Sequence, residues 1–144
     1  MRPSQPSNRI LAIDYGERRI GLAISDALGF TAQGLPTLNV SSMKKALRAI
    51  QEIMAEYQVN TLVVGLPRNM DGTEGPEANK VRTFARRLEE RTGAQLILWD
   101  ERLTSRAALR TMQDMGLKTK GRKGDIDRIA ATLMLEEYLS RPRS

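Results

Sequence analysis

Hydrophobic residues in this chain form short runs separated by turn residues, and the pattern within each run predicts its secondary structure. Two apolar runs, about 9–14 and 19–26, flank a turn at Gly16 and predict a β-hairpin. The stretch 28–39, where Gly and Pro separate short apolar pieces, predicts a third strand. The continuous apolar run at 61–65 is typical of a buried parallel strand, and the stretch 95–101 predicts a further apolar strand that ends in acidic residues.

Apolar residues at helical spacing predict helices between and after these strands. One helix spans about 42–57 with Ser41 or Ser42 as its N-cap, and a second begins at Pro76 and stops before Gly93. A third is expected from Thr104 or Ser105 to about Met115, where Gly116 closes it. The last helix covers about 125–138, and its predicted buried stripe consists of Ile126, Ile129, Ala130, Leu133 and Met134.

Composition narrows the chemistry that the chain can perform. The 144 residues include no cysteine and no histidine, which excludes thiol nucleophiles, disulfides, zinc fingers and histidine-based catalysis. Carboxylates are therefore the main candidates for catalysis. The formal charge of +6 favours a polyanionic partner such as nucleic acid, although ribosomal-style basicity would give the same number.

Length and local composition predict one domain. Residues 9–139 form the expected domain, and the polar segments 1–8 and 140–144 are expected to be flexible tails. We find neither an apolar stretch of about 18 residues nor a secretory signal, so the expected location is the cytoplasm, without membrane contact.

Carboxylates stand at the ends of predicted elements. Asp14 ends the first strand and Glu101 ends the last one, whereas Asp125 and Asp127 open the final helix. Each has a simpler interpretation, because Asp14 can cap the turn at Gly16 and an Asp in a first helical turn is stabilised by the helix dipole. Together they can form a metal site at one edge of the sheet. Hard carboxylate oxygens suit Mg²⁺ or Mn²⁺, and two ions about 3.5–4 Å apart would support phosphodiester hydrolysis.

Two loops are candidates for contact with phosphates. The loop 65–77 contains Arg68 and Asn69 and follows a predicted buried strand. It is longer than an ordinary strand-to-helix connection, which favours a functional role, but a plain connection is the alternative. The segment 118–124 carries four positive charges and two glycines and predicts a basic loop that binds phosphate backbones, or else a solvated turn. Basic residues on the second helix, from Lys80 to Arg91, are expected to be solvated.

Four segments resemble the YqgF family, also called RuvX, within the ribonuclease H-like superfamily. They are 13–21 (IDYGERRIG), 64–76 (VGLPRNMDGTEGP), 100–105 (DERLTS) and 127–131 (DRIAA), in a chain whose predicted order is β-β-β-α-β-α-β-α. The resemblance implies an α/β, ribonuclease H-like fold with a mixed five-stranded sheet and helices on both faces. It also implies a divalent-metal nuclease with Asp14, Glu101 and Asp127 as its acids. Arg128 departs from the family pattern, and Asp125 has no fixed counterpart, so it is either a fourth ligand or a helix cap.

The resulting hypothesis is a metal-dependent nuclease that acts on structured nucleic acid. The family is assigned to maturation of the 5′ end of pre-16S ribosomal RNA, and its members are likened to Holliday-junction resolvases. Candidate metal ligands and catalytic residues are Asp14, Glu101 and Asp127, with Asp125 as a candidate ligand. Candidate nucleic-acid contacts are Arg18, Arg68, Asn69, Arg102, Lys118, Lys120, Arg122 and Lys123.

Three alternatives stay open at this stage. A resolvase would cut four-way DNA junctions and would require a symmetric homodimer. A non-catalytic RNA-binding or ribosome-associated factor would keep the fold without cleavage. An actin-like kinase is suggested by the glycines at 16 and 21, but it would need a second, similar domain for which 144 residues leave no room.

Overall fold

The computed structural model describes residues 9–101 and 123–141, whose strands form a five-stranded sheet in the order β3-β2-β1-β4-β5. β1 and β2 pair antiparallel, as do β2 and β3, whereas β4 runs parallel to both β1 and β5. The strands are β1 (Ile10–Asp14), β2 (Arg19–Ser25), β3 (Ala32–Asn39), β4 (Thr61–Leu66) and β5 (Gln95–Asp100). The predicted hairpin and the mixed sheet are confirmed.

The helices are α1 (Met43–Tyr57), α2 (Pro76–Thr92) and α4 (Lys123–Ser140). Ser42 caps α1 by accepting a hydrogen bond from the backbone of Lys45 at 3.2 Å, and Gly93 ends α2 in a left-handed conformation with φ of 68°. The helix predicted from 104 to 115 lies outside the described residues. Within the described ranges, no helix is long and apolar enough to cross a bilayer.

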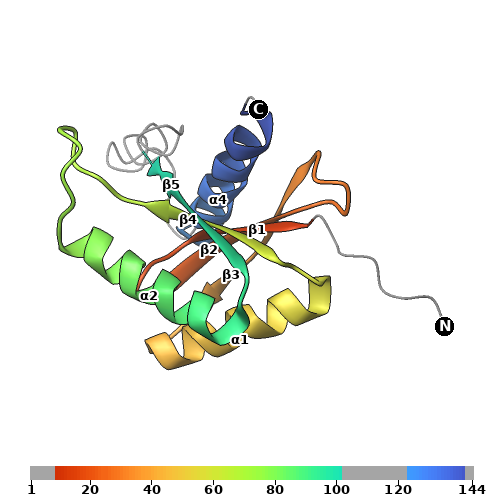
Figure 1. Cartoon of the computed structure of the whole chain (residues 1–144), viewed down its shortest axis with the longest axis horizontal. Helices are drawn as coiled ribbons and strands as arrows, with labels where there is room; N and C mark the ends of the chain where they lie inside the picture. The colour runs from red at the N-terminus through yellow and green to blue at the C-terminus, as the bar shows by residue number, and fades with distance from the viewer. Residues whose placement is uncertain (1–8, 102–122, 142–144) are drawn as a thin grey trace.

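Helices cover both faces of the sheet, as Figure 1 shows, with α1 and α2 on one side and α4 on the other. Strand alternation sorts the side chains between the two faces. Large residues such as Leu11 and Ile13 pack with α1 and α2, while the small Ala12 and Ala23 belong to the cluster formed with α4. The small residues on the second face allow α4 to lie close to the sheet.

The predicted buried stripe of α4 was partly wrong. Ala130 and Met134 are buried as expected, but Ile129 is 43% exposed, and the residues that complete the buried face are Ala131, Leu135 and Tyr138. Apolar residues occur all around this helix, so their spacing alone did not select one face. The packing partners decide instead, because Leu135 and Tyr138 belong to the cluster formed with the sheet, where the ring of Tyr138 packs edge-on against Trp99 of β5.

Candidate active site

Asp14 is the last residue of β1 and one of the few buried charged residues in the described part of the chain, at 6% exposure. By strand alternation it shares the α4 face with Ala12. In the sheet, Asp14 pairs with Gly21 of β2. On the other side of β1, the parallel strand β4 pairs its Val64 with Ile13. Asp14 is the next residue after Ile13 and Gly65 is the next after Val64, so these two lie side by side. Asp14 therefore has a glycine on each flank.

These two glycines leave the space through which two other acids reach Asp14. A Cβ atom on Gly21 would collide with the backbone carbonyl of Asp127 in α4. A Cβ atom on Gly65 would lie 2.9 Å from Oε1 of Glu101, which directly follows β5. Both approaches are closer than any other residue type would permit without movement, so the two glycines position Asp127 and Glu101 beside the end of β1.

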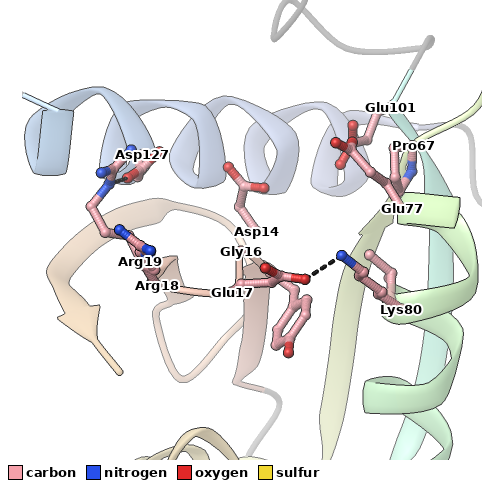
Figure 2. Close-up of a pocket in the computed structure, with 12 residues that line it drawn as sticks. Asp14, Gly16, Glu17, Arg18, Arg19, Pro67, Glu77, Lys80, Glu101 and Asp127 are labelled. Carbon is pink, nitrogen blue, oxygen red and sulfur yellow. Dashed lines mark hydrogen bonds and ion pairs between the residues drawn. The ribbon is translucent and has the colours of Figure 1, made fainter. Parts of the chain in front are cut away.

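The three acids line one open pocket of about 440 Å³. In Figure 2, Asp14 points into the space between Asp127 on α4 and Glu101 beyond β5. Asp100, which alternation places on the opposite face, does not line this pocket. The acidic lining residues are Asp14, Glu17, Glu77, Glu101 and Asp127, and the basic ones are Arg18, Arg19 and Lys80. The pocket is therefore rich in acid although the whole chain is basic.

Ion pairs cross the pocket at two places. Nε of Arg19, the first residue of β2, donates to Oδ2 of Asp127 at 2.8 Å. Nζ of Lys80 on α2 donates to Oε1 of Glu17 in the turn after β1, as Figure 2 shows. This hydrogen bond and the Lys80 charge lower the pKa of Glu17, and the same bond raises the pKa of Lys80. The Glu17–Lys80 pair thus ties the β1–β2 turn to α2.

The donor set has the chemistry of a Mg²⁺ or Mn²⁺ site, because it consists of carboxylate oxygens without histidine or cysteine. The distances between these carboxylates are larger than those of a site that holds an ion. Among residues 9–101 and 123–141, no three acidic side chains stand close enough to hold one ion. The carboxylate of Asp127 is turned to Arg19 instead.

Tyr15, next to Asp14, anchors the end of β1 against α2. Its ring stacks on Phe84 with 4.3 Å between ring centroids and 22° between ring planes. Burial raises the pKa of Tyr15, and the nearby charge of Glu17 raises it further. Since Phe84 is fully buried, this stack fixes the backbone that carries Asp14.

Sequence reasoning missed Tyr15, Glu17, Arg19 and Lys80 as residues of this pocket. For the turn residues a signal was present, because they lie within five positions of Asp14. For Lys80 there was none, since only the fold brings α2 to the β1–β2 turn. Arg18 was selected as a nucleic-acid contact, and it does line the pocket.

The loop after β4 is organised by Glu74. Oε1 and Oε2 of Glu74 accept hydrogen bonds from Nε and Nη2 of Arg82 at 2.6 and 2.7 Å, and Arg68 lies 3.6 Å from Oε2 of the same carboxylate. The Arg82 guanidinium holds the pKa of Glu74 below its usual value. Asn69 donates to Thr73 at 2.9 Å within the loop. Arg68 and Asn69 do not line the pocket, but they directly follow Pro67, which does.

The remaining candidate residues cannot be placed at the pocket. Arg102, Lys118, Lys120 and Arg122 lie outside the described residues. Asp125 and Lys123 fall in the first turn of α4, and only their backbone is described. Their roles as ligand, cap or phosphate contact stay predictions.

Comparison with known proteins places this geometry in a family. Residues 8–141 match the family model RuvX, described as Holliday junction resolvase. A relative from Ruminiclostridium cellulolyticum, named "Putative pre-16S rRNA nuclease", is 46% identical over 92% of this chain and 94% of its own. Relatives of the same name from Clostridium botulinum and Listeria innocua are 47% and 44% identical, and each comparison covers 91% of this chain and 96% of the relative.

Solved structures with the same fold include two resolvases. Thermus thermophilus RuvC in complex with a Holliday junction substrate has a TM-score of 0.54 at 17% identity, covering 90% of this chain and 93% of that one. The yeast mitochondrial Holliday junction resolvase Ydc2 has a TM-score of 0.56 at 11% identity, covering 95% and 80%. This likeness confirms the expected ribonuclease H-like fold. With a family match over nearly its whole length and relatives more than 40% identical, the chain belongs to the RuvX family.

Proposed function

We propose that this chain is a divalent-metal-dependent nuclease that hydrolyses phosphodiester bonds, with the 5′ end of pre-16S ribosomal RNA as its substrate. The observation that carries the proposal is the meeting of Asp14, Glu101 and Asp127 in one pocket, from three separate elements. Relatives 46–47% identical carry the name of a pre-16S rRNA nuclease. A cytoplasmic location belongs to the same proposal.

Asp14, Glu101 and Asp127 would hold the Mg²⁺ or Mn²⁺ ions. When bound, such ions activate a water molecule for attack and stabilise the leaving oxygen of the phosphodiester. Two ions are expected for this donor set, with Asp125 as a candidate fourth ligand. The acids also explain why a cation is needed here, because an acid-rich pocket without one repels the phosphate of the substrate.

Basic residues outside the acid cluster would hold the nucleic-acid backbone. Arg18 lines the pocket, and Arg68 and Asn69 belong to the loop beside it. The other candidates on the chain are Arg102, Lys118, Lys120, Arg122 and Lys123. Contacts of this kind are independent of base sequence and weaken steeply with salt, so affinity should fall as ionic strength rises.

A cleavage assay with two substrates tests this function. Wild-type protein and Asp127→Asn are incubated with precursor 16S rRNA and, in parallel, with a DNA four-way junction, in Mg²⁺ or Mn²⁺. We expect the wild type to trim the RNA and the variant to bind it without cleavage. Glu136→Gln, an exposed acid on the same helix, is the matched control and should cleave like the wild type. Binding of the RNA without cleavage by the wild type would overturn the nuclease proposal.

A second candidate function is the resolution of Holliday junctions, favoured by the description of the matched family. Paired incisions at a four-way junction require a symmetric homodimer. Symmetric cleavage of the DNA junction together with intact precursor RNA would favour this function over the first. A protein that is monomeric during the assay would exclude it.

A further inference from the structure

The Arg19–Asp127 pair connects the two elements that meet at Gly21. Arg19 begins β2 two residues before Gly21, and the backbone of Asp127 rests against Gly21 itself. The side chains are partly accessible, with exposed fractions of 38% for Arg19 and 23% for Asp127. The backbone of Asp127 is therefore fixed by packing, whereas its carboxylate and the Arg19 guanidinium have room to turn.

This ion pair uses an oxygen that the proposed metal site needs. Oδ2 of Asp127 accepts a hydrogen bond from Arg19 at 2.8 Å, and the described acids do not form an assembled group for one ion. A guanidinium and a divalent cation are both drawn to the same carboxylate, so they compete for it. The structure thus shows Asp127 in the guanidinium-bound arrangement.

Release of Arg19 would leave a guanidinium beside the same pocket. Arg19 lines the pocket together with Asp14 and Glu101. Guanidinium groups bind phosphate oxygens through paired N–H donors, and they do so better than ammonium groups. Lys80, by contrast, is paired with Glu17 and not with one of the three proposed metal ligands.

We propose that Arg19 is a positioning residue that holds Asp127 until a divalent cation takes this carboxylate, and that the released guanidinium then binds a phosphate of the nucleic acid. The inference rests on the proposed metal site and adds an order of events to it. Arg19 keeps the charge of Asp127 neutralised before the cation arrives. Metal binding and phosphate binding are thereby coupled through one side chain.

The first test measures Mn²⁺ binding by calorimetry, without substrate, in four proteins. These are the wild type, Arg19→Gln, the matched control Arg18→Gln and the double variant Arg19→Gln/Asp127→Asn. Both single variants remove one positive charge from the pocket, so their difference isolates the contact with Asp127. We expect Arg19→Gln to bind Mn²⁺ about three- to fivefold more tightly than Arg18→Gln. A difference of this size in affinity matches the strength of a partly exposed ion pair.

If Arg19 had only a structural role, Arg19→Gln would damage the site and weaken Mn²⁺ binding, whereas the proposal predicts tighter binding. In the double variant, the gain should disappear. Equal or weaker Mn²⁺ binding by Arg19→Gln, relative to Arg18→Gln, would overturn the inference and leave the proposed nuclease intact. Absence of Mn²⁺ binding from the wild type would overturn the metal site and this inference together.

The second test concerns the phosphate contact. Without metal, Arg19 is engaged with Asp127, so Arg19→Gln should lose only the small part of its affinity for precursor RNA that follows from leaving the Asp127 charge unneutralised, as measured by fluorescence anisotropy. With Mn²⁺, the protein concentration that gives half of the maximal single-turnover cleavage rate should rise several-fold in Arg19→Gln, clearly more than the loss of affinity without metal. An equal loss of RNA affinity with and without Mn²⁺ would overturn the coupling.

Discussion

The carboxylate of Glu101 occupies the space that a side chain on Gly65 would fill, since a Cβ atom there would lie 2.9 Å from Oε1 of Glu101 and 3.0 Å from Sδ of Met134. We therefore expect Gly65→Ala to displace Glu101 from the pocket. Because these atoms belong to flexible side chains that can move aside, the free energy of unfolding should fall by only about 1 kcal/mol or less, whereas the cleavage rate should fall at least tenfold. Urea denaturation and a single-turnover assay measure the two effects.

Gly75→Ala is the matched control for added volume, because no atom lies within 4 Å of a Cβ built on Gly75. Gly75 is the N-cap of α2, so alanine there should lower the free energy of unfolding by up to about 1 kcal/mol, but the cleavage rate should stay at the wild-type value. Equal losses of cleavage rate at the two glycines would show that the contact with Glu101 is not what makes Gly65 necessary.

Asp26 stabilises the β2–β3 turn in a pH-dependent manner. Its Oδ1 accepts hydrogen bonds from the backbone of Phe30 at 2.7 Å and Thr31 at 3.3 Å, and these bonds lower its pKa from the ordinary value of 3.8. A depressed carboxyl pKa gives stability that is complete above 3.8 and is lost as pH falls through the folded-state pKa. Urea unfolding between pH 7 and pH 2 should therefore show wild type and Asp26→Asn converging below about pH 4. A difference that widens on acidification would contradict this assignment.

Glu74 should control the order of the loop after β4. Replacement by Gln removes the charge that holds Arg82 through two hydrogen bonds and draws in Arg68. We expect Glu74→Gln to be cut faster by protease within residues 67–75, with the sites identified by mass spectrometry. Glu90→Gln, at an exposed position of α2, is the control. Cleavage at the wild-type rate in Glu74→Gln would reject the anchoring role.

Phe84 joins the core to the site through its stack on Tyr15. The ring is fully buried, and truncation to alanine should lower the free energy of unfolding by about 3–5 kcal/mol, measured in urea. Phe84→Leu keeps much of the volume and should cost clearly less. Similar losses for both variants would contradict this expectation, because they would mean that the volume of leucine replaces none of the contribution of the ring.

Most of the fold could be predicted because local patterns and tertiary packing agree. The hairpin, the parallel strand β4 and the capped helix α1 follow from apolar runs, turn residues and a serine N-cap. α4 is the exception, since Leu135 and Tyr138 are buried and Ile129 is exposed. An apolar helix presents no single stripe, and only the surface opposite it selects the buried face.

The acids of the site could be anticipated, and their surroundings could not. Strand ends and a helix start predicted that Asp14, Glu101 and Asp127 would meet, and all three line one pocket. The contacts of Arg19 with Asp127 and of Lys80 with Glu17 join residues 108 and 63 positions apart. Such pairs depend on how whole helices and strands pack together, and the periodicity of the sequence does not predict this packing.

The cleavage rate of Asp14→Asn on precursor 16S rRNA, in Mg²⁺ or Mn²⁺, shows whether the acids of the pocket carry out hydrolysis. The substitution keeps the shape of a side chain that is 6% exposed and removes the charge at the centre of the pocket. We expect a loss of more than about a hundredfold in single-turnover rate with RNA affinity retained. Cleavage at the wild-type rate by a folded Asp14→Asn protein would contradict this prediction.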